Sequence, residues 1–502
     1  MEIQQPDAMG ERVSRRNVLR GGAAVLAASA MPQSVAQPAR TPPRDAIYFA
    51  SVADIAARIG RGELSSEEVV TACIDRIEAV NPALNAVVQM TPDAALARAR
   101  EADAARARGV SWGPLHGVPM TIKDSFDTAG VVSSGGTLGR ARFVPQRDAT
   151  VVARLRGAGA ILLGKTNTPE LTLSFETDNL VYGRTANPYD LDRSPGGSSG
   201  GAAAIVAAGG APFDIGSDYG GSIRAPAHFC GIAGLKPTAG RVPRTGHVFP
   251  FGGIQDAYQQ IGPLARYVDD LALLLPLIAG PDFIDPGVTA QPLADPRRVE
   301  LASLRIAFHS DNGVLAADAD VAEAVTVAAR ALEPDVRAVE ERRPPGAERG
   351  VEIGFGLTMW DGGSAVRRLL EEAGTERHTL APLMGGTALD AEQLGRLIAD
   401  WYAWRSTMLA FLAEWDVILC PVTASCAPRH GFMAEPNALL SFGYSMTYNA
   451  TGWPAAVVRV GTSAEGLPIG VQIVAAPSRE DVALAVAKHV ESALGGFRPP
   501  PG

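Results

Sequence analysis

The sequence predicts an α/β protein whose central β-sheet is mixed, largely parallel and covered by helices on both faces. Short apolar segments alternate with stretches of helical periodicity along most of the chain. Strands that are buried on both faces read as continuous apolar runs, which is typical of sheets covered by helices. The length of 502 residues and the hydrophobic share of 46% fit a globular protein that needs no metal or disulfide to stabilise its core.

The N-terminal part of this fold is predicted to be helical. Ser51 and Ser65 are typical N-cap residues, and apolar side chains follow Ser65 at helical spacing as far as Pro82. A second helix is predicted over residues 91–108, where threonine is followed by proline at the first helical position.

Strands and helices alternate over the rest of the chain. Apolar runs predict strands at residues 117–124, 161–163, 213–216, 456–460 and 468–474. Periodic stretches predict helices at residues 149–157, 200–208, 364–370, 391–415 and 480–494. Because residues 281–345 are rich in proline and acidic side chains, we expect a variable helical excursion around residues 281–415.

Residues 1–36 have the features of an export signal. The run SRRNVLR contains twin arginines and precedes an apolar stretch, and the small residues Ser34 and Ala36 follow where a signal peptidase can cut. The apolar stretch is shorter than the roughly 20 residues that span a bilayer, so stable membrane insertion is not expected. We therefore expect a twin-arginine signal peptide at residues 1–36, a single domain at residues 37–502 and a periplasmic location.

Composition argues against nucleic acid and metal as partners. The formal charge of −9 leaves no basic footprint for nucleic acid. The cysteines lack the paired spacing of a zinc site, so we expect no metal and no other cofactor. A bridge between Cys420 and Cys426 stays open for an exported protein, although their apolar surroundings favour unpaired thiols. Whether the protein forms a homodimer also stays open.

Glycine is concentrated between Ser194 and Gly240, in the runs SPGGSSGG and GSDYGGSIR. Glycines allow positive φ angles and a close approach of the backbone to a bound group. A phosphate-binding loop is one alternative, but neither glycine run is followed by the lysine of a GxxxxGK[ST] motif, and no GxGxxG pattern opens a helix here. A purely structural role is the other alternative. The hydroxyls of Ser198, Ser199 and Ser222 within the same segment favour a catalytic site.

These segments resemble the signature of the amidase signature family of serine amidohydrolases. The similarity is dense over residues 117–243 and returns in DVILCPVTASCAP, NATGWPAAVV and GLPIGVQIV, at residues 416–428, 449–458 and 466–474. The resemblance implies the amidase signature fold across the mature chain. It also implies hydrolysis of a carboxylic amide to an acid and an amine or ammonia, with a small-molecule amide and water as the reactants.

By the same resemblance, three residues form a catalytic triad. The family's lysine falls on Lys123 in TIKD, its middle serine beside a cis peptide falls on Ser198 in GGSSGG, and its nucleophile falls on Ser222 in GGSIR. Ser199 is expected to support the loop. The two remaining lysines in family segments, Lys165 and Lys236, are interpreted as scaffold residues.

The resemblance also predicts how the nucleophile's turn works. Asp218 and Arg224 are expected to brace this turn. The sequence departs from the common form of the family at Ser217, where threonine is usual, and at the variable position 219, and neither change removes a catalytic atom. The oxyanion hole is expected to consist of the backbone amides of Tyr219, Gly220, Gly221 and Ser222.

The chemistry requires Lys123 to be neutral. Free lysine has a pKa of about 10.4, so it becomes a base at neutral pH only where burial disfavours its charge. Lys123 ends an apolar strand, where Ser198 can relay a proton between Ser222 and the amine. An ion pair with Asp124 is the alternative, but successive strand residues point to opposite faces. The histidines in or beside these segments match no catalytic position of the family: His116, His228, His247 and His430.

The substrate pocket is predicted less sharply. Family members line the acyl side with the segment that holds Thr172, Leu173 and Ser174, although these residues fit a core role equally well. Carbamate and ester hydrolysis share the same tetrahedral chemistry and stay as alternatives. The rival classes are a glutaminase-like subunit of a tRNA amidotransferase and a non-catalytic periplasmic binding protein.

Overall fold

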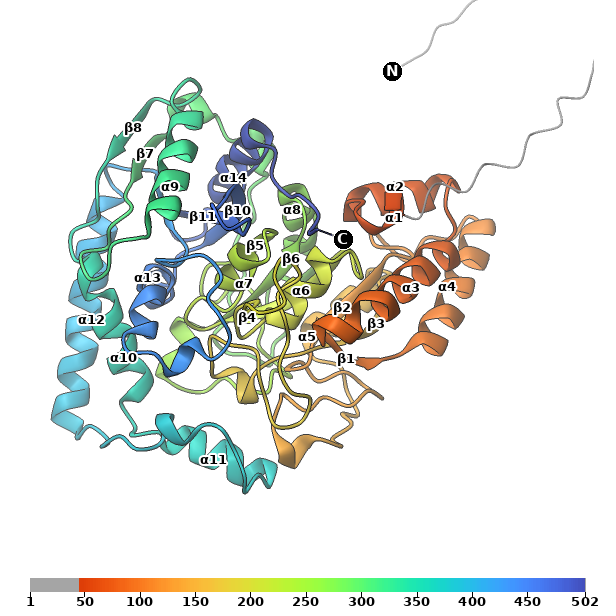
Figure 1. The fold of residues 1–502 in the computed structure, drawn as a ribbon, viewed down its shortest axis with the longest axis horizontal. Helices are drawn as coiled ribbons and strands as arrows, with labels where there is room; N and C mark the ends of the chain where they lie inside the picture. Colours follow the sequence, from red (N-terminus) through yellow and green to blue (C-terminus); the bar gives the residue numbers. More distant parts are fainter. Residues whose placement is uncertain (1–44, 502) are drawn as a thin grey trace, which may run out of the picture. The chain divides into compact units, whose positions relative to one another are not determined.

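The computed structural model describes residues 45–501 of the chain (Figure 1). The predicted signal peptide at residues 1–36 lies outside the described residues. The described residues 45–501 belong to one compact unit. The boundary at residues 36 and 37 stays a prediction.

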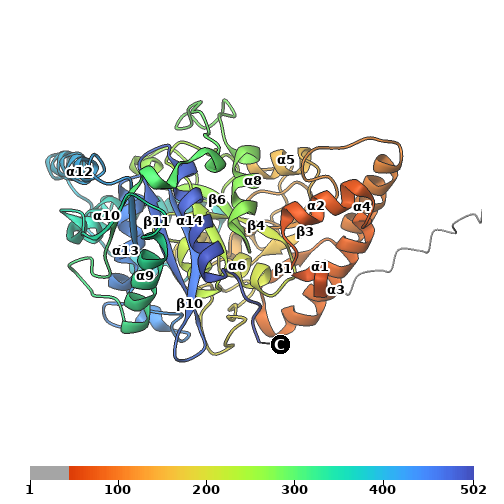
Figure 2. The same cartoon turned by 90° about the horizontal axis from the view of Figure 1, so that it is seen from above.

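Two β-sheets organise this unit (Figures 1 and 2). The smaller has the order β1-β3-β2 and consists of β1 (Val87–Met90), β2 (Pro119–Lys123) and β3 (Ile161–Thr166). The larger has eight strands in the order β4-β6-β5-β10-β11-β9-β7-β8. Its strands are β4 (Phe213–Asp218), β5 (Ala233–Lys236), β6 (Gln260–Ala265), β7 (Arg305–Phe308), β8 (Ala338–Glu341), β9 (Val417–Pro421), β10 (Ala455–Thr462) and β11 (Pro468–Ala475).

The α/β class with a mixed sheet is confirmed, but the sheets are less parallel than the sequence indicates. Among the strands of residues 45–501, the parallel pairs are β2 with β3, β7 with β8 and β7 with β9. The remaining pairs are antiparallel, including the β10–β11 hairpin at the centre of the large sheet. Apolar runs report that both faces of a strand are buried and carry no information on strand direction, which explains the error.

Three N-terminal helices follow the prediction closely. After the short α1 (Asp45–Tyr48), they are α2 (Val52–Arg61), α3 (Ser66–Leu84) and α4 (Pro92–Ala107). The Ser51 side chain accepts a hydrogen bond from Asp54 N, and Ser65 forms a capping box with Glu68, so both predicted caps are confirmed. α3 continues through Pro82 and ends before Asn85, which adopts a left-handed conformation.

Helices also pack against the large sheet. α8 and α9 contact α14 and the sheet, and α6 and α7 contact β4 and β10 respectively. The remaining helices are α5 (Thr150–Gly157), α6 (Gly200–Ala207), α7 (Arg224–Phe229), α8 (Val268–Ile278), α9 (Ala319–Leu332), α10 (Gly350–Met359), α11 (Ser364–Ala373), α12 (Ala391–Phe411), α13 (Gly443–Ala450) and α14 (Glu480–Leu494). The predicted terminal helix at residues 480–494 has the bounds of α14.

The segment at residues 281–415 is more than a helical excursion. It contains α9 to α12, but it also supplies β7 and β8, which extend the large sheet beyond β9. Both strands have four residues, and β8 is half polar, so neither forms an apolar run long enough to predict. This segment is therefore part of the sheet that supports the rest of the fold.

Asp214 joins the two sheets at the point where the candidate site begins. Its Oδ2 accepts hydrogen bonds from Thr121 Oγ1 on β2 at 2.7 Å and from Thr166 Oγ1 on β3 at 3.0 Å. Its Oδ1 accepts one from Lys123 N at 3.1 Å. Burial raises the pKa of Asp214 to about 6, and these hydrogen bonds oppose that shift. The ends of β2, β3 and β4 are thereby held together.

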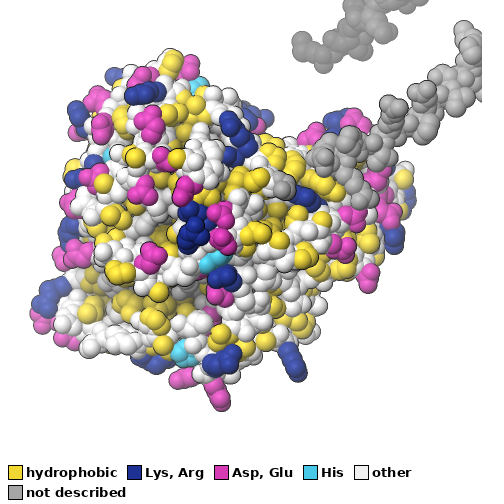
Figure 3. All heavy atoms as spheres, in the orientation of Figure 1, with side chains coloured by type: hydrophobic (Ala, Val, Ile, Leu, Met, Phe, Trp, Pro, Cys, Tyr) yellow, Lys and Arg dark blue, Asp and Glu magenta, His cyan; other side chains and the backbone are white. Residues whose placement is uncertain are grey.

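On the face of the molecule that Figure 3 shows, neither basic nor acidic side chains form a dominant patch. Figure 3 shows basic and acidic side chains interspersed over that face. No helix within residues 45–501 has the length and apolarity needed to cross a membrane. All four cysteines are unpaired thiols, and Cys420 is buried while Cys426 is half-buried.

Candidate active site

Lys123, the last residue of β2, is fully buried among hydroxyl groups. Its Nζ lies 2.7 Å from Ser198 Oγ and 3.0 Å from both Ser199 Oγ and Ser217 Oγ. Within residues 45–501, no carboxylate lies within ion-pair distance of this amine. The lysine predicted as the base therefore faces three hydroxyls and no compensating charge in contact.

This setting changes the protonation of Lys123. Burial lowers its pKa well below the ordinary value of 10.5, and the negative charges of Asp214 and Asp218 only partly oppose this effect. A lysine with a lowered pKa can be neutral near pH 7 and can then accept a proton. Arginine, which stays charged, cannot replace it in this role.

Asp124, the alternative partner of Lys123, pairs with a different lysine. Its Oδ1 lies 3.6 Å from Lys165 Nζ, and its Oδ2 accepts a hydrogen bond from Ser134 Oγ at 2.6 Å. Lys165 Nζ also donates to Phe126 O at 2.6 Å. The two neighbours in sequence have separate partners, so the ion pair between Lys123 and Asp124 does not form.

Ser198 and Ser199 lie in the turn that leads into α6. The peptide bond between Gly197 and Ser198 is cis. This turn passes directly over the backbone of the neighbouring segment, because a Cβ on Gly197 would lie 2.7 Å from the carbonyl carbon of Phe175. Only glycine fits this close approach, which positions Ser198 Oγ against Lys123.

Ser222 lies in the turn between β4 and α7. Its carbonyl accepts a hydrogen bond from Ser199 N at 3.2 Å, which holds this turn against the Ser198–Ser199 segment. Ser222 is 5% exposed, and its Oγ makes no hydrogen bond with the described residues. Catalytic hydrogen bonds are often long or poorly aligned before substrate binds. The structure thus links Lys123 to Ser198 directly, and the contact between the hydroxyls of Ser198 and Ser222 stays a prediction.

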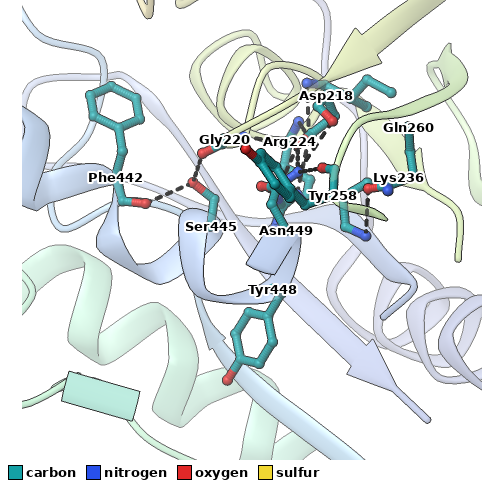
Figure 4. A network of polar contacts seen from close by, with 12 residues as sticks. Asp218, Gly220, Arg224, Lys236, Tyr258, Gln260, Phe442, Ser445, Tyr448 and Asn449 are labelled. Carbon is teal, nitrogen blue, oxygen red and sulfur yellow. Dashed lines mark hydrogen bonds and ion pairs between the residues drawn. The ribbon is translucent and has the colours of Figure 1, made fainter. Parts of the chain in front are cut away.

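A buried ion pair braces the turn that carries Ser222 (Figure 4). Asp218 accepts hydrogen bonds from Gly221 N at 2.8 Å and from Ile223 N at 3.1 Å. Arg224 donates to both oxygens of this carboxylate, through Nε and Nη2, at 3.0 Å each. Burial by itself disfavours the Asp218 carboxylate, but the charge of Arg224 together with the hydrogen bonds from Arg224 and Asn449 and the charge of Lys236 outweighs burial and keeps the pKa of Asp218 below its ordinary value. The bracing role predicted for the pair matches these contacts.

Two polar residues that the sequence analysis missed complete this network. Asn449 on α13 donates from Nδ2 to Asp218 Oδ1 at 2.8 Å, and its Oδ1 contacts Arg224 Nη2. Gln472 on β11 accepts from Arg224 Nη1 at 3.0 Å through Oε1. Both residues are polar and buried in the segments NATGWPAAVV and GLPIGVQIV. For Gln472, a lone amide in a run that reads as a buried strand was the available signal, whereas Asn449 lies on α13 and outside any such run.

The four predicted oxyanion amides are not equivalent. The amide of Gly221 donates to Asp218, whereas the amides of Tyr219, Gly220 and Ser222 donate to no acceptor among the described residues. The turn is covered by Ser445, whose Oγ donates to Gly220 O at 2.9 Å (Figure 4). A Cβ on Gly221, whose φ is +130°, would lie 2.3 Å from this Oγ, so the turn requires glycine there. Three unpaired amides thus remain at the position predicted for the oxyanion hole.

The predicted pocket residues have different surroundings. Thr172 is 6% exposed with a φ of +64°, and Leu173 packs against a hydrophobic cluster that includes Leu171 and Val248. Ser174 Oγ accepts a hydrogen bond from Glu176 N at 3.1 Å. A cavity of about 350 Å³ lies beside this cluster. It is lined by Gly139, Arg140, Phe143, Leu171, His247, Val248, Pro250, Leu369, Glu372 and Ala373. None of the three predicted residues lines this cavity.

His247 is a further residue at the site that the sequence analysis set aside. Its Nε2 lies 3.0 Å from Ser217 Oγ, the third hydroxyl around Lys123. The family resemblance offers no catalytic position for this histidine, so only the structure reveals the contact. Among the described residues, no group of histidine, cysteine or carboxylate side chains is arranged to hold a metal ion.

These contacts support one kind of chemistry. A neutral amine next to a serine hydroxyl can act as a general base, and a second serine on a braced turn with unpaired amides can act as a nucleophile. Such an arrangement suits the cleavage of an acyl bond.

Comparison with known proteins agrees with this chemistry. The family model described as Amidase matches residues 68–484. The chain is 37% identical to a glutamyl-tRNA(Gln) amidotransferase subunit from Moorella thermoacetica, over 89% of this chain and 96% of the relative. It is 35% identical to fatty-acid amide hydrolase 2-B of Danio rerio, over 98% and 99% of the two chains. Among solved structures, 6-aminohexanoate cyclic dimer hydrolase in complex with its substrate has a TM-score of 0.80 at 29% identity, covering 90% of this chain and 99% of that chain.

Proposed function

This chain belongs to the amidase family and is an amide-hydrolysing enzyme, and from that premise we propose that it cleaves the C–N bond through a seryl acyl-enzyme on Ser222. In this route Ser222 Oγ attacks the amide carbonyl while its proton passes to Ser198 and the proton of Ser198 passes to Lys123. The amides of Tyr219, Gly220 and Ser222 stabilise the negative oxygen of the tetrahedral intermediate.

The second half of the reaction returns the protons. Lys123 gives its proton back through Ser198 to the leaving nitrogen, so that the C–N bond breaks and an amine or ammonia departs. Water then attacks the ester on Ser222, and the same relay removes its proton and restores the Ser222 hydroxyl. The products are a carboxylic acid and the free enzyme.

One observation carries this proposal. Lys123 Nζ lies 2.7 Å from Ser198 Oγ in a buried setting where no carboxylate within residues 45–501 contacts the amine. A lysine with a purely structural role would be expected to hold a carboxylate or a carbonyl, as Lys165 and Lys236 do. Only a role that needs a neutral amine explains a lysine placed among hydroxyls.

The substrate is a small-molecule amide in this proposal. Carbamates and esters pass through the same tetrahedral intermediate and stay as alternatives for the same triad. We further propose export through the twin-arginine route to the periplasm, on the basis of the SRRNVLR run. Export separates this chain from the role of a tRNA amidotransferase subunit, which one of its relatives performs.

The test uses the purified mature protein with a serine-reactive fluorophosphonate and a panel of anilides, aliphatic amides, carbamates and esters. We expect labelling on Ser222 and hydrolysis of at least one amide without any added protein partner. A periplasmic binding protein would bind without turnover and would not be labelled. Labelling on Ser199, or activity that appears only when further subunits are added, would contradict the proposal. Size-exclusion chromatography of the same sample determines whether the enzyme is a homodimer.

A further inference from the structure

His247 reaches the Lys123 amine through a single hydroxyl. Its Nε2 lies 3.0 Å from Ser217 Oγ, and Ser217 Oγ lies 3.0 Å from Lys123 Nζ. The histidine is 5% exposed, and its ring packs edge-on against Phe126, with 5.0 Å between the ring centroids. The position therefore allows His247 to influence Lys123 through Ser217.

The backbone around His247 is tied to the segment that follows Lys123. Val248 N donates to Ser125 O at 2.7 Å, and Asp127 N donates to Gly246 O at 2.8 Å. Residues 125–127 follow β2 closely in the sequence. These hydrogen bonds therefore fix the position of the His247 imidazole relative to the Lys123 amine.

His247 is neutral in this environment. Burial lowers its pKa to about 3, and the positive charges of Arg244 and Arg140 act in the same direction. Glu372, in the cavity that His247 lines, is the acidic group on that side. A neutral imidazole carries one ring hydrogen, so one nitrogen donates and the other accepts.

The surroundings of Nδ1 favour a hydrogen on that nitrogen. Phe249 O lies 3.1 Å from Nδ1, and Gln259 Nε2 lies 3.4 Å from Nδ1, while the Oε1 of the same amide is buried and makes no hydrogen bond within the described residues. Rotation of this amide would present the oxygen to Nδ1. Phe249 N, at 3.2 Å, is the single fixed donor on this side. With the Gln259 amide rotated in this way, Nδ1 faces two acceptors and one donor, which leaves Nε2 as the acceptor for the hydroxyl hydrogen of Ser217.

Each hydrogen and the lone pair of the neutral Lys123 amine can then be assigned a partner. A neutral amine has two hydrogens and one lone pair, and it faces three hydroxyls. Ser217 is turned toward His247, and Ser199 Oγ donates to Ser217 O at 3.4 Å, so both offer a lone pair to the amine. The amine hydrogens are used on these two serines. The lone pair of Nζ is left for Ser198, which makes the shortest of the three contacts, at 2.7 Å.

We propose that His247 is a positioning residue that accepts the hydroxyl hydrogen of Ser217 and thereby keeps the lone pair of Lys123 directed at Ser198. Without this acceptor, the Ser217 hydroxyl can turn its hydrogen toward Nζ and occupy the lone pair that the reaction needs. The proposal rests on the proposed function, since it assigns a role within the same proton relay.

The kinetic test compares His247→Phe with His247→Gln, each in the natural chain and in a Ser217→Ala background. Phenylalanine keeps the ring contact with Phe126, whereas glutamine restores an acceptor. We expect His247→Phe to slow the acylation of Ser222 by a small fluorophosphonate about tenfold with unchanged inhibitor binding, and His247→Gln to recover most of the rate. In the Ser217→Ala background the two variants should acylate at equal rates, because no hydroxyl is left to misdirect.

Equal slowing by His247→Phe in both backgrounds would overturn the proposal, since it would show that the ring acts only by packing or as a cavity wall. No slowing in the natural chain would overturn it as well. If Lys123→Met and Ser222→Ala stay inactive while His247→Phe has no effect, the triad stands and only the role of His247 fails.

A second measurement uses the natural enzyme and does not depend on whether a variant is active. Nitrogen-15 NMR of histidine-labelled natural enzyme reports the ring tautomer, and the signal that disappears in His247→Gln assigns His247. We expect a neutral ring with the hydrogen on Nδ1 between pH 5 and pH 9. A hydrogen on Nε2, or a ring that is charged at pH 6, would contradict the proposal.

Discussion

Two buried lysines on neighbouring strands have different partners. Lys123 lies on β2 and Lys165 on β3, and the parallel register places Lys165 opposite Ile122. Both side chains are fully buried. Lys123 contacts three serine hydroxyls, whereas Lys165 lies 3.6 Å from the Asp124 carboxylate and donates to Phe126 O at 2.6 Å.

The difference shows that burial alone does not produce a base. Burial lowers the pKa of both lysines, but that of Lys165 falls only to about 8, because the charges of Asp124 and Asp127 oppose it. Lys123 has no carboxylate in contact within the described residues, so its pKa falls well below the ordinary value. The choice of partners separates a lysine that can take a proton from one that holds a loop.

The largest expected effect comes from exchanging Lys123 and Lys165 in turn for methionine. Lys123→Met should reduce the acylation rate of Ser222 by about 10⁴-fold or more, because no other group in contact with Ser198 can take the proton. Lys165→Met should retain the acylation rate of each folded molecule within about fivefold. Fluorophosphonate labelling measures both, with circular dichroism as the control for folding. Similar losses in the two variants would remove the distinction between the lysines.

Removal of the brace on the nucleophile's turn should have the next largest effect. Asp218→Asn deprives Arg224 of its carboxylate and the Gly221 amide of its ionic acceptor, so the oxyanion amides lose their alignment. We expect kcat for amide hydrolysis to fall by about 10²-fold to 10³-fold with a smaller change in KM. Steady-state kinetics on the best amide of the panel measure this, and a change confined to KM would argue against a role in the transition state.

The ion pair of Lys165 should contribute to stability. Asp124→Asn leaves a buried lysine without its charged partner, and we expect the free energy of unfolding to fall by about 3–5 kcal/mol. Urea denaturation monitored by tryptophan fluorescence measures the loss. The double variant Asp124→Asn with Lys165→Met should recover part of it. A double variant that is less stable than the sum of the two single changes would show that the pair is not the source of the effect.

The pH dependence of acylation should follow Lys123. Its pKa is lowered by burial, so the neutral base accumulates once the pH exceeds this lowered value, and the rate rises with pH and then levels. We expect the plateau to begin well below pH 10.5, the ordinary pKa of the amine. A labelling rate that still rises between pH 9 and pH 10.5 would show a lysine that keeps its charge.

The smallest effect should come from the exposed lysine on α14. Lys488 lies 2.7 Å from Asp269 and 2.9 Å from Glu491, and its side chain is 42% exposed. Surface ion pairs contribute little, so Lys488→Ala should change the free energy of unfolding by about 0.5 kcal/mol and leave acylation unchanged. A larger loss of stability in thermal unfolding would show that a lysine of this chain contributes strongly to stability whether or not it is buried.

The sequence predicts the elements whose signals are local. The Ser65 capping box, the helix over residues 480–494 and the strand that carries Lys123 follow from residue type and spacing. Strand direction and the four-residue strands β7 and β8 do not follow from such local signals. Strand pairing depends on segments that are distant in the sequence. For the site, the resemblance assigns the triad to Lys123, Ser198 and Ser222. His247, Asn449 and Gln472 join the site through contacts between segments that no local pattern encodes.

The central claim is that Lys123 is neutral at the pH of catalysis. The chain suits a direct measurement, because its lysines are confined to Lys123, Lys165, Lys236 and Lys488. Carbon-13 NMR of the lysine Cε atoms, assigned with single Lys→Arg or Lys→Met variants, gives the titration of each amine. We predict that Lys123 titrates far below Lys488 and at the same pH as the acid limb of Ser222 acylation. A Lys123 signal that stays protonated throughout that limb would contradict it.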